Sequence, residues 1–245
     1  MDHMKLYDIA EYYMELINPF DEEKIRTVGK HLGLEKGKKV IEFGCGFAEI
    51  MVIWAETFGI EAEGIELREY AYQRGLKKIR DKGLSDRLKI MCGNGAEYKF
   101  EKGAFDVAAC IGASFIWGDY PSTIRAMKEA IHPKGKLVIG EPYLLKEPMP
   151  PEYVEGKDVF SEYELVKIAR EEGFDIEYMV RASSDDWDRY EATNWLGLVK
   201  WLEENPDHPE KQEVIDWFQK TQDDYLKFGR EYLGWAVYIL NPVKY

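Results

Sequence analysis

The chain has 245 residues, enough for one large domain with its own core, and 45% of them are hydrophobic and 32% charged. No apolar run approaches the ~20 residues of a membrane span, and the acidic, aromatic N-terminal segment does not resemble a signal peptide. The formal net charge of −13 and the lack of a long Lys/Arg cluster argue against DNA or RNA as a partner and favour a small molecule.

Three cysteines, Cys45, Cys92 and Cys110, lie at or near the ends of expected strands. We expect them to be small buried residues of a cytoplasmic protein, because a reducing compartment keeps thiols unpaired. No Cys/His spacing predicts a metal site.

Two amphipathic helices are expected before the first strand. Apolar residues recur at helical spacing through residues 4–17, and Asn18-Pro19 ends that pattern. Asp21 then caps a second helix, which Gly33 ends. Residues 1–34 therefore form an N-terminal helical cap, which either covers a ligand as a lid or packs as an extension of the domain.

The first strand, residues 39–43, runs directly into the turn Gly44-Cys45-Gly46, and a helical pattern follows over 49–58. A strand, a glycine turn and a helix are typical of a nucleotide-binding α/β unit. Gly44 adopts backbone angles that a side chain resists, and Gly46 lets a ligand lie on the main chain. Unpaired N–H groups of the helix then point at that ligand.

Glu42 lies two residues before the first glycine of this turn. A buried acid is costly unless a cation or donors satisfy it, and the α-ammonium of a methionine moiety would do so. The spacing Glu42-x-Gly44-x-Gly46-x-Ala48 resembles motif I of the class I S-adenosylmethionine-dependent methyltransferases. Ala48 stands where that family often has a third glycine.

Glu66 follows the second expected strand, residues 62–65, twenty residues after Gly46. An acid at this distance accepts hydrogen bonds from both ribose hydroxyls of an adenosine, and Leu67 lies beside it. The alternative is an exposed carboxylate that opens the helix over 68–82. With motif I before it, we favour the ribose role.

The third expected strand, residues 88–92, ends in Gly93-Asn94-Gly95-Ala96. Small residues there would let an adenine ring lie against the backbone, with the Asn94 amide near its exocyclic amine. Asn and Gly are also ordinary turn residues. The methyltransferase family often has Asp where Asn94 stands.

The fourth expected strand, residues 105–111, is nearly all apolar, as a central parallel strand should be. It resembles the family's F-D-x-V strand, and the resemblance implies that Cys110 and Ile111 face the methionine part of the cofactor. A helix over 120–131 and a turn at 132–135 follow, the turn resembling the family's K-P-G-G. His132 is expected to be a residue of that turn and no catalytic group.

Strand five, residues 136–140, ends in Glu141-Pro142-Tyr143. In an open α/β sheet the ligand lies outside the carboxyl ends of the strands, so a substrate is expected there. Glu141 is the candidate general base, and Tyr143 is the candidate for orienting an acceptor. The alternative for Glu141 is a solvated acid or a helix partner.

The rest of the chain completes an α/β architecture. Residues 148–151 are expected to form a loop, 161–172 a helix capped by Ser161, and 174–182 a sixth strand. Two long helices follow, with Asp185 and Asp186 as expected N-caps, before a last strand over 235–240.

The resemblance to the class I methyltransferases covers the whole chain and is closest to an uncharacterised prokaryotic branch that acts on small molecules. It implies a Rossmann-like, seven-stranded, mostly parallel sheet in the order 3-2-1-4-5-7-6, within a domain of residues 35–245 that has a helical insertion at about 185–233. The segments that carry it, besides motif I, are Asn18-Pro19-Phe20, Cys110-Ile111-Gly112-Ala113-Ser114, Gly140-Glu141-Pro142-Tyr143, Trp187-Asp188-Arg189-Tyr190-Glu191 and Gly234-Trp235-Ala236.

The chemistry so implied is methyl transfer from S-adenosylmethionine, in which alignment and exclusion of water matter most and no metal is required. Trp117, Trp187 and Tyr190 are candidate substrate residues, since an aromatic pocket suits an apolar or cationic acceptor. The alternative is that these rings pack the inserted helices.

Two other functions compete with methyl transfer. One is an NAD(P)-dependent oxidoreductase, against which Glu42 and the shortened glycine spacing argue. The other is a protein that binds the cofactor without turnover, which no residue of the sequence excludes. The sequence predicts neither the acceptor nor the oligomeric state.

Overall fold

The computed structural model describes residues 1–154 and 159–243. The strands are β1 (Lys39–Phe43), β2 (Glu61–Glu66), β3 (Leu88–Cys92), β4 (Phe105–Ile111), β5 (Ile131–Leu144), β6 (Phe174–Arg181) and β7 (Leu233–Pro242). They form one sheet in the order β3-β2-β1-β4-β5-β7-β6, in which only β7 runs antiparallel to its neighbours. The predicted sheet order and its mostly parallel character are confirmed.

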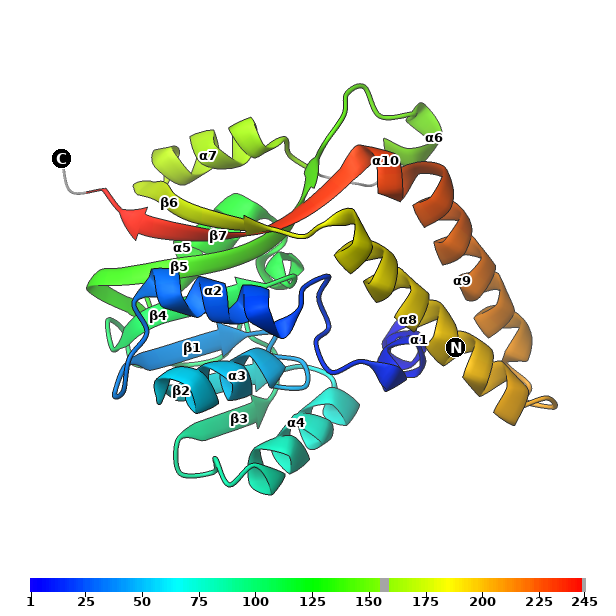
Figure 1. Cartoon of the computed structure of the whole chain (residues 1–245), viewed down its shortest axis with the longest axis horizontal. Helices are drawn as coiled ribbons and strands as arrows, with labels where there is room; N and C mark the ends of the chain where they lie inside the picture. Colours follow the sequence, from blue (N-terminus) through cyan, green and yellow to red (C-terminus); the bar gives the residue numbers. More distant parts are fainter. Residues whose placement is uncertain (155–158, 244–245) are drawn as a thin grey trace.

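Helices cover both faces of this sheet (Figure 1). The α-helices are α1 (His3–Ala10), α2 (Glu22–Leu32), α3 (Glu49–Phe58), α4 (Glu69–Asp81), α5 (Tyr120–Met127), α6 (Pro151–Val154), α7 (Glu162–Glu171), α8 (Ser184–Glu204), α9 (Lys211–Asp224) and α10 (Arg230–Tyr232). Two 3-10 turns, η1 (Glu11–Tyr13) and η2 (Ser114–Trp117), and a π-helical turn, η3 (Tyr225–Gly229), complete the fold.

Alternate side chains of β1 enter two separate cores. Val40 packs with Trp54 of α3 on one face. Ile41 and Phe43 pack with Ile124 of α5 on the other. All five side chains are fully buried, and each contributes roughly 1.5–3 kcal/mol before the cost of ordering the chain. Because both faces are covered, the ligand-binding surface is left at the carboxyl edge of the strands.

The predicted start and end of the second helix are confirmed. The Asp21 side chain accepts a hydrogen bond of 2.8 Å from the Lys24 backbone N–H, and Gly33 ends α2 with a φ of 70°. Ser161 caps α7 as predicted, in a capping box with Glu164.

The first helix is shorter than the predicted span of 4–17. It ends at Ala10, and after η1 the chain becomes irregular. The guanidinium of Arg74 on α4 binds the carbonyl oxygens of Tyr12 and Met14, which a continuing helix would use internally. The contact from Arg74 of α4 therefore ends the first helix earlier than Pro19 would.

The segment 132–135, predicted as a turn, lies inside β5, which begins at Ile131 and not at 136. The register of β4 and β5 shifts after the pair Phe105–Ile131, and the extra residues form a bulge. The His132 Nε2 atom lies 3.2 Å from a carboxylate oxygen of Asp106 at this bulge. His132 is thus a residue of a strand and not of a turn.

Three smaller predictions about ends and caps were wrong. Helix α5 ends at Met127 and not at 131, and α6 begins within the segment 148–151 that was predicted as a loop. The N-cap of α8 is Ser183, whose side chain accepts from the Asp186 backbone N–H. Asp186 completes a capping box in the first turn, next to Asp185, because the chain enters the helix two residues earlier than expected.

The insertion between β6 and β7 lies beyond the carboxyl edge of the sheet. In Figure 1, α8 and α9 run side by side, and α1 lies against α8. Gly197 permits this contact, because a Cβ atom there would be only 2.4 Å and 2.5 Å from the carbonyl oxygens of Ala10 and Ile9. The N-terminal helix is therefore docked onto the inserted pair.

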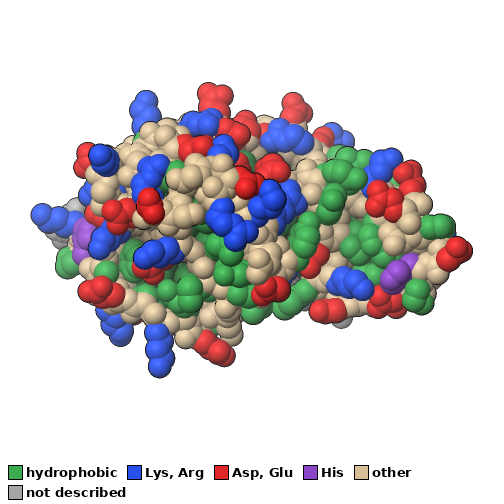
Figure 2. Space-filling model, turned by 90° about the horizontal axis from the view of Figure 1, so that it is seen from below, with side chains coloured by type: hydrophobic (Ala, Val, Ile, Leu, Met, Phe, Trp, Pro, Cys, Tyr) green, Lys and Arg blue, Asp and Glu red, His purple; other side chains and the backbone are tan. Residues whose placement is uncertain are grey.

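Two surface properties bear on possible partners. Within residues 1–154 and 159–243, no helix has both the length and the apolar character to cross a bilayer. On the face seen in Figure 2, Lys and Arg are interspersed with Asp and Glu. This face offers no continuous basic track of the kind that binds nucleic acid.

Candidate functional site

The glycine turn after β1 is fixed by hydrogen bonds to β2. The backbone N–H groups of Gly44 and Cys45 donate to the Ile65 carbonyl at 2.8 Å and 3.0 Å. Gly44 and Gly46 have φ values of 71° and 53°, and Ala48 shares the left-handed region with a φ of 57°.

 Ala48 is the one of these three residues with a side chain, and its backbone is strained because a Cβ atom disfavours a positive φ.

This turn forms the floor of a cavity of about 700 Å³ at the carboxyl edge of β1, β2 and β4. The opposite wall comes from α1, from the segment that follows it, and from Tyr190 of α8. A Cβ atom on Gly46 would lie 2.8 Å from Ile17 Cδ1 in that segment, and one on Gly44 would lie 2.5 Å from Ala113 Cβ. The glycines are therefore required both for the turn and for the close approach of neighbouring segments.

Most of the predicted cofactor-binding residues line this cavity. Those that line it are Glu42, Gly44, Cys45, Gly46, Glu66, Leu67, Asn94, Gly95 and Ile111. Ala96 lies next to the lining, and its backbone N–H donates to the Asn94 side-chain oxygen at 3.0 Å. Cys110 is fully buried in the core on the α5 face, because alternate residues of β4 point to opposite faces.

The cysteines do not share one environment. Cys45 and Cys110 are buried as expected, but Cys92 is exposed at the end of the outermost strand, β3, where its thiol lies 3.2 Å from a Glu69 carboxylate oxygen. The expectation of a third buried cysteine was therefore wrong. An edge strand has no neighbour on its outer side to cover such a residue.

Glu42 is buried at the bottom of the cavity, with 2% of its surface exposed. Its Oε2 atom has no hydrogen-bond partner among the described residues. Burial, together with the negative charge of Glu66, raises the pKa of Glu42 to about 8. A buried carboxyl group without a partner is suited to a ligand that brings a cation or a hydrogen-bond donor.

Glu66, at the tip of β2, is held in one orientation by two backbone groups. Its Oε2 accepts from the Gly46 N–H and its Oε1 from the Arg68 N–H, each at 2.9 Å. A carboxylate has about four acceptor positions, so two remain for other donors. This geometry suits an acid that binds two hydroxyl groups of a ligand.

Arg68 is a site residue that the sequence reasoning missed. Its guanidinium lies 3.0 Å from an Asp8 oxygen and 2.6 Å from a Glu11 oxygen, and its Nε lies 3.7 Å from Glu66. The burial of Glu11 raises the pKa of that carboxyl to about 7, while Arg68 acts to lower it. The arginine therefore links the acid at the tip of β2 to the N-terminal segment. The sequence signal for this arginine site was the pair of acids Asp8 and Glu11, which lie three residues apart in the predicted first helix.

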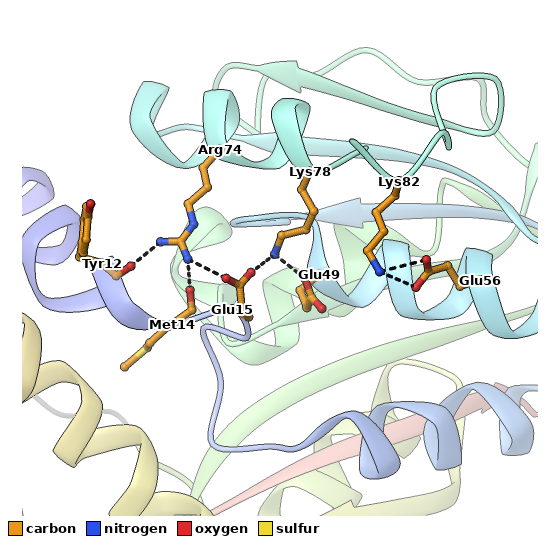
Figure 3. Close-up of polar contacts among 8 residues, drawn as sticks. All are labelled: Tyr12, Met14, Glu15, Glu49, Glu56, Arg74, Lys78 and Lys82. Carbon is orange, nitrogen blue, oxygen red and sulfur yellow. Dashed lines mark hydrogen bonds and ion pairs between the residues drawn. The ribbon is translucent and has the colours of Figure 1, made fainter. Parts of the chain in front are cut away.

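Helix α4 also holds the segment after α1, as Figure 3 shows. Arg74 binds the Tyr12 carbonyl at 2.8 Å as well as the Met14 carbonyl and the Glu15 carboxylate. Lys78 forms ion pairs with Glu15 and with Glu49 of α3. These contacts fix the N-terminal segment across the mouth of the cavity.

The two predicted catalytic residues lie on the α5 face of β5, outside the residues that line the cavity. Burial raises the pKa of Glu141 to about 7, and its Oε1 has no hydrogen-bond partner among the described residues. The Tyr120 hydroxyl, close enough for its pKa to respond to the charge of Glu141, has no described partner either. Tyr143 is packed in the core, where its ring would meet a Cβ atom on Gly234.

Of the three predicted substrate residues, one lines the cavity and the other two contact side chains outside its lining. Tyr190 lines the cavity. The Trp117 ring packs edge-on against Phe43 at 5.0 Å, and the Trp187 indole N–H donates to Glu191 at 3.1 Å. Among the described residues, no group of three or more His, Cys, Asp or Glu side chains is placed to hold a metal ion.

The comparisons with known proteins agree with this arrangement. Residues 40–135 match a family described as a methyltransferase domain. The chain is 32% identical to "Uncharacterized protein YjhP" of Escherichia coli strain K12, across 98% of this chain and 99% of that one.

Two solved structures are similar over nearly the full length. One is a SAM-dependent methyltransferase from Thiobacillus denitrificans in complex with S-adenosyl-L-homocysteine, with 33% identity, a TM-score of 0.92, and coverage of 99% of this chain and 100% of that one. The other is a SAM-dependent methyltransferase from Geobacter sulfurreducens in complex with the same compound, with 33% identity, a TM-score of 0.92 and 98% coverage of both chains.

Proposed function

The chain belongs to the class I S-adenosylmethionine-dependent methyltransferases, and from this premise we propose that it transfers the methyl group to a small-molecule acceptor. The observation that carries the proposal is the buried carboxyl of Glu42, whose Oε2 has no hydrogen-bond partner in the described part of the chain and which lies beside the glycine turn in a cavity of about 700 Å³. That volume suits a cofactor together with a small acceptor.

The residues of the cavity fit S-adenosylmethionine. Glu42 would bind its ammonium group, and the two remaining acceptor positions of Glu66 would bind its ribose hydroxyls. The turn at Gly44, Cys45 and Gly46 leaves room for the cofactor against the main chain. The remaining predicted contacts that we propose are Leu67, Asn94, Gly95 and Ala96 around the adenosine and Ile111 toward the methionine part, whereas the buried Cys110 is assigned no contact with the cofactor.

The bound cofactor supplies a methyl group on a positively charged sulfonium. The chain's own task is then to align the acceptor and exclude water. The ion pairs of Arg68 and the hydrogen bonds of Arg74 hold the N-terminal segment over the cavity, which supports that second role.

Glu141 lies outside the cavity lining, and its Oε1 has no hydrogen-bond partner among the described residues, so we propose it as the base for an acceptor that must lose a proton and that extends from the cavity toward the α5 face of β5. A pKa of about 7 allows a carboxylate to be ionised near neutral pH and still to hold a proton. Tyr143 packs in the core beside Gly234, and we assign it no contact with the acceptor. Trp117 is likewise assigned to packing, and Tyr190 to the acceptor side of the cavity.

The test is the formation of S-adenosylhomocysteine from S-adenosylmethionine in the presence of fractions of a metabolite extract. We expect wild-type protein to form it with at least one fraction, at a rate that rises as the pH passes through about 7. Glu141→Gln should lower this rate about a hundredfold or more and remove the pH dependence. A protein that binds S-adenosylmethionine but forms no product with any fraction would support binding without turnover.

The nicotinamide alternative has its own readout. A dinucleotide-binding protein has an apolar strand end before this turn and the spacing G-x-G-x-x-G within it, whereas this chain has Glu42 at the strand end and a shortened glycine spacing. We therefore expect no binding of NADH in the same calorimetric conditions in which S-adenosylmethionine binds.

A further inference from the structure

Glu191 on α8 is a largely buried acid that lacks a cationic partner. Its carboxylate accepts a hydrogen bond of 3.1 Å from the Trp187 indole N–H. In the part of the chain that the structure describes, no Lys or Arg forms an ion pair with it. Three acids that line the cavity, Glu11, Glu15 and Glu49, each have an Arg or Lys partner, whereas Glu42 shares the lack of one among the described residues.

Aromatic rings surround this carboxylate. Trp187 and Trp195 lie one turn before and one turn after Glu191, and therefore on the same face of α8. The Tyr225 ring of η3 lies 6.4 Å from the first indole and 6.1 Å from the second, measured between centroids. The buried indole N–H of Trp195 has no hydrogen-bond partner among the described residues.

This aromatic group adjoins the cavity. Tyr190 lies next to Glu191 in the helix and lines the cavity together with Tyr7 of α1. Burial raises the pKa of Tyr7, of Tyr190 and of Tyr225, and the nearby charge of Glu191 adds a smaller contribution in the same direction. The carboxylate is thus close to hydroxyl-bearing rings from three different elements, two of which face the ligand space.

A buried carboxylate beside aromatic faces is suited to one class of ligand. An isolated buried charge is costly, and an organic cation removes that cost by pairing with it. Ring faces add attraction for a cation through their quadrupoles. The net charge of −13 attracts such a ligand to the protein. A neutral or anionic ligand gains neither the pairing with the carboxylate, nor the attraction to the ring faces, nor the attraction to the negatively charged protein.

We propose that Glu191, with Trp187, Tyr190 and Tyr225, binds a positively charged group of the methyl acceptor, which is therefore an organic ammonium compound. This subsite rests on the proposed function, because Tyr7 and Tyr190 line the part of the cavity that we assign to the acceptor. It also gives Trp187 a role that packing alone does not require, because its indole N–H orients the carboxylate.

Choline and its uncharged isostere, in which carbon replaces the quaternary nitrogen, are the probes. Binding is followed by tryptophan fluorescence of the full chain, in the presence of S-adenosylhomocysteine. Wild-type protein should bind choline at least about tenfold more tightly than the isostere. Glu191→Gln keeps the size of the side chain and the acceptor for Trp187, and it should abolish this preference. Glu204→Gln, on an exposed part of the same helix, should retain it.

The proposal is overturned if wild-type protein binds both probes equally, or neither, or if Glu191→Gln keeps the preference for choline. Calorimetric titration with S-adenosylmethionine separates these results from a failure of the proposed function. Normal binding of S-adenosylmethionine by wild type and by Glu191→Gln means that only the ammonium subsite is in question. No binding of S-adenosylmethionine by the wild type refutes the proposed function, and with it the assignment of this subsite to an acceptor.

Discussion

Replacement of Glu42 by glutamine should make the ligand-free protein more stable at alkaline pH. Burial and the charge of Glu66 raise the pKa of Glu42 from an ordinary 4.5 to about 8. Between these values the folded state keeps a proton that the unfolded chain has released. The stability that this protonated group allows is therefore present below pH 4.5 and is lost as the pH rises toward 8.

The size of the effect follows from the difference between 4.5 and about 8. One pKa unit corresponds to about 1.36 kcal/mol, so an ionised Glu42 destabilises the folded state by roughly 5 kcal/mol. Glutamine has nearly the same shape but never ionises. The cost of burying its amide does not depend on pH, so it cancels when the stability difference between variant and wild type is compared at two pH values.

Urea unfolding of wild type and Glu42→Gln, at about pH 5 and about pH 8.5, measures this change. We expect the stability difference to move in favour of the variant by roughly 4 kcal/mol between the two conditions. Glu61→Gln, at an exposed position at the start of β2, should show no such change. A difference that is independent of pH, or one that moves in favour of the wild type, would refute the assignment of Glu42 as a buried, unpaired acid.

Three further substitutions test the turn, the N-terminal docking and the start of α8. Gly46→Ala should lower affinity for S-adenosylmethionine more than about tenfold in calorimetry, because the Cβ would lie 2.8 Å from Ile17 Cδ1 at a φ of 53°. Gly197→Ala should speed hydrogen exchange in α1, because the Cβ would lie 2.4 Å from the Ala10 carbonyl oxygen; unchanged exchange would contradict the docking. Asp186→Asn should lower stability in urea by about 1–3 kcal/mol, since it weakens the cap and the ion pair with Lys24.

The sheet could be predicted because its signals are local. The apolar runs, the glycine turn, Asp21 and Gly33 each determine a strand, a turn or a helix end within a few residues. The order of the strands followed from the resemblance to a known family and not from these patterns. The register of β4 and β5 at Ile131 was missed, because a bulge depends on the neighbouring strand.

Most of the predicted residues that line the cavity follow strands β1 to β4, and Tyr190 of α8 is the exception. Glu42 and Glu66 lie at strand ends, whose position in the sheet the fold determines. Arg68 and Arg74 were missed because their partners lie about sixty positions earlier in the chain, on a segment that the pattern assigned to one continuous helix. Tyr143 was placed near the acceptor from its position after strand five, but its ring points into the core.

Calorimetric titration of S-adenosylmethionine into wild type, Glu66→Ala and the control Glu61→Ala is the most direct test of the site. Wild type and the control should bind equally. Loss of the two hydroxyl contacts to a carboxylate should weaken binding by Glu66→Ala by roughly 1.5–3 kcal/mol, about ten- to a hundredfold. Equal binding by Glu66→Ala would contradict the position assigned to the ribose, and no binding by the wild type would contradict the methyltransferase assignment itself.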